Sequence, residues 1–294
     1  MTTILVTGKT GQVGQELQNS LMPYGHVIAM DRSQMDLTDP DSIRRTIREV
    51  APNIIVNAAG YTAVDKAESE PDIAMRVNAI APGVMAEEAR RLNARLIHYS
   101  TDYVFDGRNS EPYIETDEPN PVNVYGRSKL EGERAIAAVG CQHLILRASW
   151  IYSATGTNFL LTILRLAREK KELAIVDDQI GSPTSAKALS LATAELIEKI
   201  RGPLSEQGVF HLSATGAVSR LEFTRKIVEI AKQLSGNAAG WATLQPTTTA
   251  LFPLPAMRPL NAATSKEKIK RVFGIEMTNW QSQLKSCMHG IFSK

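Results

Sequence analysis

Tyr125 and Lys129 are the residues whose types and spacing most directly suggest chemistry in this chain. They lie in the segment Tyr125-Gly-Arg-Ser-Lys129, and a separation of four residues places both side chains on one face of a helix. A phenol titrates near a pKa of about 10, and a neighbouring ammonium favours its ionised form. Such a tyrosine can exchange a proton with a carbonyl or alcohol oxygen near neutral pH. Surface helices carry the same spacing by chance, so the pair needs support from its surroundings.

A glycine-rich loop near the start of the chain supplies that support. Gly8, Gly11 and Gly14 follow an apolar run and open a helical pattern, in the order G-x-x-G-x-x-G. Glycines let the backbone approach a pyrophosphate, and a helix N-terminus offers free N–H groups and a favourable dipole. A glycine-rich turn without a ligand is the alternative. The loop predicts a dinucleotide cofactor held by Gly8, Thr10, Gly11, Gln12, Val13 and Gly14.

The residues after the second apolar run bear on the choice of cofactor. Asp31 lies about 20 residues beyond the middle glycine, where an acid usually binds the ribose hydroxyls. Arg32 follows, and its guanidinium suits a 2′-phosphate, although a solvated surface charge explains it equally well. Asp36 and Leu37 would flank an adenine, or Asp36 would cap the next helix. The sequence therefore leaves NADH and NADPH both open.

Residues in three further parts of the sequence would shape the cofactor and substrate sites. Ala58, Ala59 and Gly60 follow the third apolar run, and their small size lets a flat cofactor pass, although a tight turn would have the same composition. Trp150 offers an apolar wall for a sugar or fills the core. Arg258, in a proline-rich loop, could bind a nucleotide diphosphate.

An alternation of strands and helices must position these residues. Apolar runs predict buried parallel strands at residues 4–7, 26–30, 53–57, 95–100 and 143–147. Amphipathic patterns predict helices at 12–21, 42–50, 71–92 and 123–139. This order is typical of a Rossmann-type α/β fold with a doubly wound parallel sheet, whose ligands bind at the carboxyl edge of the strands.

The rhythm loosens after about residue 150. Helical patterns persist at residues 158–169, 186–200, 220–234 and 278–291, and residues 247–259 predict an ordered proline-rich loop. We therefore expect a dinucleotide-binding domain over residues 1–150. Residues 151–294 would form mainly a smaller substrate-binding lobe, with some segments returning to the core sheet.

Composition limits the classes of function. The 294 residues are 43% hydrophobic and 22% charged with a net charge of +2, which argues against a nucleic-acid or polybasic membrane surface. Cys141 and Cys287 are far apart and have no metal or redox spacing. The start of the chain does not resemble a signal peptide, and no uncharged apolar run could cross a bilayer. We expect a soluble cytoplasmic protein. His98, in an apolar strand, is expected in the core, and His26, His143 and His211 have no metal-ligand partner at useful spacing.

Taken together, the glycine loop, Asn57-Ala-Ala, Thr101, Tyr125 and Lys129 resemble the extended short-chain dehydrogenase/reductase superfamily. Longer blocks are similar to one of its families, the dTDP-4-dehydrorhamnose reductases: residues 57–68, 98–107, 123–133, 147–152, 178–184 and 258–259. Several independent blocks in the right order make this resemblance specific, and it extends almost to the C-terminus.

The resemblance implies reduction of the 4-keto group of dTDP-6-deoxy-L-lyxo-4-hexulose to dTDP-L-rhamnose, a precursor of cell-surface polysaccharide, with NADPH or NADH. Tyr125 would donate the proton, Lys129 would lower its pKa and bind the nicotinamide ribose, and Thr101 would polarise the carbonyl. Further cofactor contacts are implied at Gly11, Gln12, Val13, Asp31, Asp36, Leu37, Gly60, Tyr61, Thr62 and Tyr99. Substrate contacts are expected at Val64, Thr101, Asp102, Tyr103, Trp150, Asn158 and Arg258.

The resemblance leaves some properties open. Some family members bind magnesium at a dimer interface, and Glu16 matches one ligand position, but no further ligand can be assigned. Monomer and homodimer both remain open. A related nucleotide-sugar 4-ketoreductase or epimerase would share the catalytic group. A non-catalytic nucleotide-binding regulatory subunit, resembling that of methionine adenosyltransferase, is a third reading, although it would not need the Tyr125–Lys129 pair.

Overall fold

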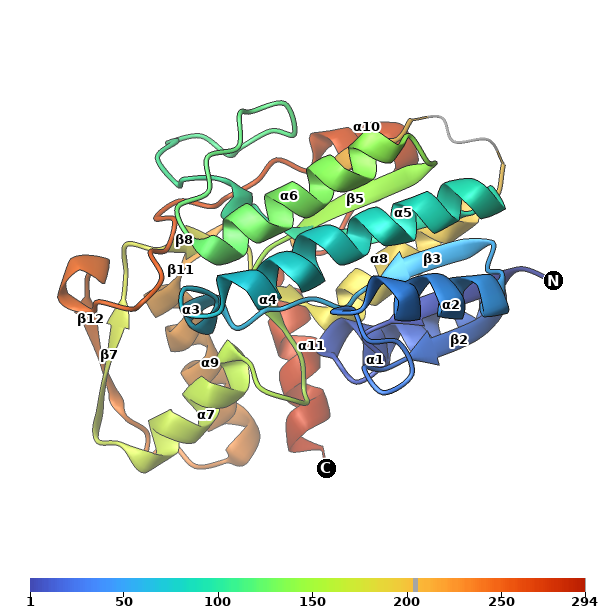
Figure 1. Ribbon diagram of the computed structural model, residues 1–294. Helices are drawn as coiled ribbons and strands as arrows, with labels where there is room; N and C mark the ends of the chain where they lie inside the picture. The colour runs from blue at the N-terminus through green and yellow to red at the C-terminus, as the bar shows by residue number, and fades with distance from the viewer. Residues whose placement is uncertain (203–205, 294) are drawn as a thin grey trace.

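The computed structural model describes residues 1–202 and 206–293, and its central feature is a parallel sheet (Figure 1). Within these residues the sheet has six strands, all paired in parallel. Their order is β10 (Gly208–His211), β5 (His143–Ala148), β4 (Arg95–Thr101), β3 (Ile54–Asn57), β1 (Thr3–Thr7), β2 (His26–Met30). The chain runs outward from β1 to β2 and then crosses back to β3, which creates a topological switch point beside β1. The predicted Rossmann-type fold is confirmed.

Alternation along the buried strands places apolar side chains on both faces of the sheet. On β1, Ile4 and Val6 join the core on one face, and Leu5 joins the core on the other. The first face is covered by α1 (Gln12–Ser20) and α8 (Ala186–Lys199). The second is covered by α2 (Pro40–Val50), α5 (Ala81–Leu92) and α6 (Val124–Val139). Two covered faces explain why the strands read as continuous apolar runs rather than as an alternating pattern.

The helix predicted over residues 71–92 is interrupted. It consists of α4 (Pro71–Met75), a π-helical turn (Arg76–Ile80) and α5, preceded by the short α3 (Val64–Ala67). The π-helical turn carries Asn78 toward α6, and Gly132 of α6 allows the two backbones to approach closely. A Cβ at Gly132 would lie 2.1 Å from the Asn78 carbonyl oxygen. Single π-helical turns of this kind occur frequently at functional sites.

A second lobe lies beyond the carboxyl edge of the sheet (Figure 1). It contains α7 (Phe159–Glu169), α9 (Arg220–Ser235) and α11 (Trp280–Phe292), packed around a core that includes Tyr152 and Phe223. Alongside them, β7 (Glu172–Val176) pairs in parallel with β12 (Thr243–Thr247).

Short strand pairs connect the lobe to the rest of the chain. The strand β6 (Ile151–Tyr152) pairs with β9 (Thr184–Ser185), and β8 (Ile180–Gly181) pairs with β11 (Val218–Ser219). Three later segments rejoin the main sheet or its core, namely α8, β10 and α10 (Glu267–Phe273).

The elements that the sequence did not predict are mainly short. The strands β7 and β12 and the helix α10 were not predicted. Pro246 lies within β12, where proline is tolerated because the strand belongs to a two-stranded edge. The loop expected at residues 247–259 contains one 3-10 turn (Thr249–Leu251) followed by irregular chain.

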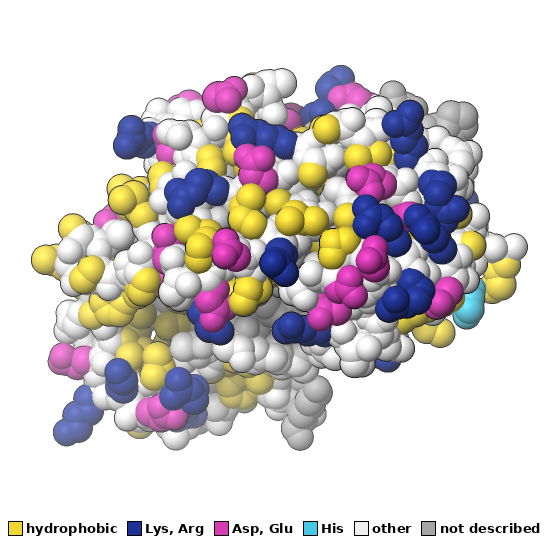
Figure 2. All heavy atoms as spheres, viewed as in Figure 1, with side chains coloured by type: hydrophobic (Ala, Val, Ile, Leu, Met, Phe, Trp, Pro, Cys, Tyr) yellow, Lys and Arg dark blue, Asp and Glu magenta, His cyan; other side chains and the backbone are white. Residues whose placement is uncertain are grey.

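The molecular surface carries mixed charge. On the face in Figure 2, lysine and arginine side chains are interspersed with aspartate and glutamate. No helix of the described residues combines the length and the apolar character that a membrane span requires.

Candidate active site

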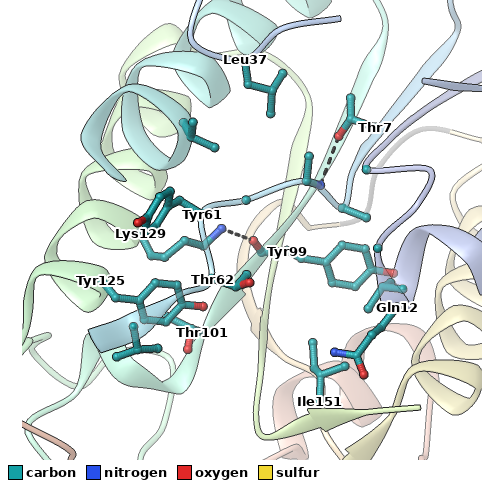
Figure 3. A pocket seen from close by; sticks show the side chains of 18 of the residues that line it. Thr7, Gln12, Leu37, Tyr61, Thr62, Tyr99, Thr101, Tyr125, Lys129 and Ile151 are labelled. Atoms are coloured by element: carbon teal, nitrogen blue, oxygen red, sulfur yellow. Dashed lines mark hydrogen bonds between the residues drawn. The ribbon is translucent and has the colours of Figure 1, made fainter. Parts of the chain in front are cut away.

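A cavity of about 1100 Å³ opens at the carboxyl edge of the sheet, where the strand ends meet the second lobe (Figure 3). Thr7, Met30, Thr101 and Ala148 end four of the strands and all line it. The structure brings most of the predicted site residues to this cavity: Gly8, Thr10, Gly11, Gln12, Val13, Asp31, Arg32, Asp36, Leu37, Ala58, Ala59, Gly60, Tyr61, Thr62, Val64, Tyr99, Thr101, Asp102, Tyr103, Tyr125, Lys129, Trp150 and Asn158. Their individual roles stay predictions.

The glycine loop has the geometry of an anion cradle. Gly8 has a φ of 75°, and a Cβ there would lie 2.9 Å from the backbone of Ala58. A Cβ on Gly14 would lie only 2.0 Å from the Gly8 carbonyl oxygen, so this glycine lets α1 start directly beneath the loop. Gly11 precedes α1, no side chain caps this helix end, and its first turn has no acidic residue. These features fit a bound pyrophosphate.

Polar groups that follow the end of β2 line one part of the cavity. The Asp31 carboxylate accepts hydrogen bonds from the Ser33 backbone N–H (2.9 Å) and hydroxyl (2.6 Å), which hold its pKa below the usual range. Arg32 is largely exposed and lies 3.9 Å from Asp36. Asp36 also accepts from the backbone and hydroxyl of Thr38, which fixes the turn before α2. Carboxylates and a guanidinium are therefore adjacent where the ribose of a dinucleotide would lie.

The side chains of Tyr125 and Thr101 lie near each other in the cavity (Figure 3). Asn123 caps α6 by accepting from the Gly126 N–H (2.7 Å), which fixes the first turn of the helix that carries Tyr125. Thr101 ends β4, and its hydroxyl oxygen accepts from the Tyr103 backbone N–H (3.1 Å). The ring of Tyr103 packs edge-on against Tyr125, with centroids 5.7 Å apart. The Thr101 hydroxyl also donates to the Asp102 carboxylate (3.1 Å), and both it and the Tyr125 phenol line the cavity.

Lys129 is buried one helical turn beyond Tyr125. Its Nζ donates to the Tyr99 carbonyl oxygen (2.6 Å) and lies 3.3 Å from His98 Nε2. Burial lowers the pKa of Lys129 to about 8, against the opposing effect of Glu133. The ammonium is therefore anchored to β4 rather than to the tyrosine.

Two opposing effects act on the acidity of Tyr125. Burial raises the pKa of Tyr125 above its ordinary value, while the neighbouring Thr101 hydroxyl works in the opposite direction. A phenol of ordinary pKa is already protonated at neutral pH, and burial strengthens that preference. The protonated phenol is the state that a proton donor requires.

A series of buried polar contacts extends from Lys129 to Thr7, the last residue of β1. His98 Nδ1 lies 2.9 Å from Asn57 Nδ2, and the side-chain oxygen Oδ1 of Asn57 accepts from the Thr7 hydroxyl (2.6 Å). Thr7 in turn accepts from the Ala59 N–H (Figure 3). Burial and the charge of Lys129 hold the pKa of His98 well below its usual value, so the ring is neutral. His98 lies in the core, as expected, but it also contacts a predicted catalytic residue.

Asn78 organises the loop that follows β3. Its side-chain oxygen accepts from the Tyr61 N–H (2.8 Å), and its amide donates to the Tyr61 carbonyl (3.0 Å) and to Ser128 (3.0 Å). The Tyr61 hydroxyl donates to Glu70 (2.6 Å) at the cavity rim. The amide therefore joins the cofactor loop to the helix that carries Tyr125 and Lys129.

Asp102 and Trp150 line another part of the cavity. Asp102 accepts from the Ser149 hydroxyl (2.7 Å), and burial raises the pKa of its carboxyl to about 6. Trp150 has a positive φ of 42°, uncommon for a bulky residue, and its indole lies against Gly181. Arg220 stacks on that indole, its guanidinium carbon 3.4 Å from the ring centroid. Arg220 lines the cavity and was missed, because no motif or spacing near it suggests a site.

Two predicted site residues, Gly14 and Arg258, do not line the cavity, and Asn158 lines it but also has a structural role. Gly14 is buried beneath the loop, as described above. Arg258 donates to Asp65 (2.8 Å) and to the Ala256 carbonyl (2.7 Å), which ties the proline-rich loop to α3, and it does not line the cavity. Asn158 lines the cavity and also caps α7 by accepting from the Leu161 N–H.

Magnesium has no assembled site in the described residues. No group of three or more His, Cys, Asp or Glu side chains is arranged to hold a metal ion there. Glu16 therefore lacks, within residues 1–202 and 206–293, the companions that a metal site in a single chain would need.

Comparison with known proteins places this geometry in context. The family model described as RmlD substrate binding domain matches residues 1–292. The chain is 41% identical over 294 residues to the dTDP-4-dehydrorhamnose reductase of Escherichia coli K12, covering 99% of this chain and 98% of that protein. It is 42% identical over 297 residues to the dTDP-4-dehydrorhamnose reductase of Burkholderia thailandensis, covering 99% of each.

Two solved structures match this chain over nearly its whole length. The dTDP-4-dehydrorhamnose reductase of Bacillus anthracis in complex with NADP matches with a TM-score of 0.91 and 33% identity, covering 99% of this chain and 100% of that one. A UDP-glucose 4-epimerase from Thermus thermophilus in complex with NAD matches with a TM-score of 0.81 at 17% identity, covering 99% of each chain, which shows a shared fold.

Proposed function

The chain belongs to the dTDP-4-dehydrorhamnose reductase family and is an oxidoreductase, and we propose that it reduces the 4-keto group of dTDP-6-deoxy-L-lyxo-4-hexulose to give dTDP-L-rhamnose. The observation that carries the proposal is the meeting of Thr101 and Tyr125 in a cavity that begins at an uncapped glycine loop. A carbonyl that sits between the two hydroxyl groups would face two donors at once.

The proposed roles follow from the chemistry of carbonyl reduction. A bound reduced nicotinamide would supply the hydride. Thr101 would donate a hydrogen bond to the carbonyl oxygen, and Tyr125, which is protonated at neutral pH, would give its proton to the alkoxide that forms. Placing both donors in a buried site strengthens their interaction with developing negative charge.

Lys129 would act on the cofactor side. Its ammonium is held by the Tyr99 carbonyl, next to Gly60, where a Cβ would approach Nζ to 4.0 Å. That position suits a hydrogen bond to a ribose hydroxyl, and the positive charge would favour the phenolate that Tyr125 becomes when it gives up its proton. We therefore propose that Lys129 orients the cofactor and assists proton transfer from Tyr125.

The cofactor is proposed to be NADPH or NADH. The uncapped start of α1 would bind its pyrophosphate. Asp31 suits free ribose hydroxyls and the exposed Arg32 suits a 2′-phosphate, so the same end of the cavity has a group for each form.

Activity with the keto sugar tests the proposal. We expect the wild-type chain to oxidise NADPH in the presence of freshly generated dTDP-6-deoxy-L-lyxo-4-hexulose. Tyr125→Phe should lower turnover by roughly 100- to 10,000-fold with the fold intact. Tyr24→Phe, outside the cavity, is the matched control.

Two results would contradict the proposal. Near-normal turnover in Tyr125→Phe would remove the proton-donor assignment. NMR of the product showing a C4 configuration other than that of rhamnose would identify a related 4-ketoreductase or epimerase instead.

A further inference from the structure

Arg220 is a cation built into the substrate end of the cavity. It is the first residue of α9, after the capping residue Ser219. Its guanidinium carbon lies 3.4 Å from the centroid of the Trp150 ring and 4.7 Å from that of Phe159. Two aromatic rings therefore hold the planar group in place, and its edges stay available for hydrogen bonds.

The surroundings of Trp150 are shaped to hold the indole in this stack. A Cβ on Gly181 would lie 2.4 Å from the indole, so only a glycine at this position lets the ring sit where it does. The positive φ of Trp150 turns the ring into that space. Backbone strain of this kind is retained where a functional geometry depends on it.

The charge of Arg220 has no close carboxylate partner. Within residues 1–202 and 206–293, no Asp or Glu oxygen lies within 4.0 Å of its guanidinium, whereas the neighbouring cation Arg258 is paired with Asp65. Its charge is attracted to Asp102 only at longer range. A half-buried cation without a close counter-ion carries part of the cost of burying a charge, and an anionic ligand would offset that cost.

The position of Arg220 separates it from the cofactor loop. Tyr103, which acts on the charge of Arg220, packs against the catalytic candidate Tyr125. The glycine loop lines the same cavity and already provides an anion site at the start of α1. Arg220, stacked on Trp150 and Phe159, therefore offers this cavity a second cationic group that is separate from the glycine loop.

We propose that Arg220 binds the diphosphate of the nucleotide-sugar substrate, with the guanidinium held against Trp150. The inference rests on the proposed function, because it names the group of that substrate which the second anion site takes. It also changes the expected role of Trp150. The indole face that was predicted to contact a sugar is covered by Arg220, so the tryptophan mainly supports the arginine.

Binding of dTDP and thymidine, measured by calorimetry on the full chain, tests this assignment. Arg220→Gln removes the charge, and Arg220→Lys keeps it without the planar fork. We expect Arg220→Gln to weaken dTDP binding by roughly 10- to 100-fold, and Arg220→Lys to recover part of the loss. Arg225→Gln, on the exposed face of the same helix and paired with Glu222, is the matched control and should bind dTDP normally.

The ligand comparison separates anion binding from a structural role. If Arg220 only supports the cavity wall, Arg220→Gln will weaken thymidine and dTDP equally, and this result would overturn the proposal. Unchanged dTDP affinity in Arg220→Gln, or no dTDP binding by the wild type, would also overturn it. NADP⁺ affinity within about two-fold of the wild type would show that the variant is folded.

The proposed reaction can fail independently. A wild-type chain that binds dTDP through Arg220 but does not oxidise NADPH with the keto sugar would refute the reduction and support the diphosphate site. Active enzyme with an unchanged KM for the sugar in Arg220→Gln would support the reduction and refute the diphosphate site.

Discussion

Replacing Lys129 with methionine should change the pH dependence of stability in a calculable way. Lys129 is 5% exposed, and burial lowers its pKa from 10.5 to about 8. In the unfolded chain the amine regains its ordinary pKa. Between pH 8 and 10.5 the unfolded state therefore binds more protons than the native state, and the wild-type protein gains stability as the pH rises. Below pH 8 the native protein carries the full cost of a buried ammonium.

The size of the effect follows from the two pKa values. One pKa unit corresponds to about 1.36 kcal/mol, so the lowering from 10.5 to about 8 is equivalent to about 3 kcal/mol. Between pH 7 and pH 10, linkage delivers most of it, about 2 to 3 kcal/mol. Lys129→Met also loses the hydrogen bond to the Tyr99 carbonyl, at a cost of about 1 to 3 kcal/mol that does not depend on pH.

We therefore expect Lys129→Met to be near the wild type in stability at pH 7 and clearly less stable at pH 10. Urea unfolding of both proteins at the two pH values measures this difference. Lys232→Met, at an exposed position of α9, is the control, and its difference from the wild type should not move with pH. A constant difference between Lys129→Met and the wild type from pH 7 to pH 10 would refute the argument that the buried amine has a lowered pKa.

Two further predictions concern the frame around the site. Gly14→Ala would place a Cβ 2.0 Å from a loop carbonyl oxygen, so NADPH affinity should fall by at least about 10-fold in a fluorescence titration, while Gly290→Ala, with open space around it, should bind normally. Glu133→Gln would break a buried ion pair with Arg147 (2.6 Å) and cost about 3 to 5 kcal/mol in urea unfolding. The exposed Glu131→Gln should cost under about 0.5 kcal/mol, and equal losses in the two glutamate variants would contradict the assigned burial.

Local pattern predicted the frame of the protein well. The strand at residues 26–30 was predicted with its observed bounds, and the other four predicted strands were correct to within a residue at each end. Buried parallel strands and amphipathic helices leave periodic signals that need no knowledge of distant contacts. The short strands of the second lobe leave no such signal, because two residues do not make a period.

The same contrast holds for the site. The sequence by itself determined that a glycine loop precedes a helix and that Tyr125 and Lys129 share a helical face, since both follow from spacing along a few turns of chain. Only the tertiary structure decided that Lys129 is bonded to β4 beside His98, that burial raises the pKa of Tyr125, and that Arg220 stacks on Trp150. These contacts join residues separated by 30 or more positions, or depend on burial, and neither is encoded in local periodicity.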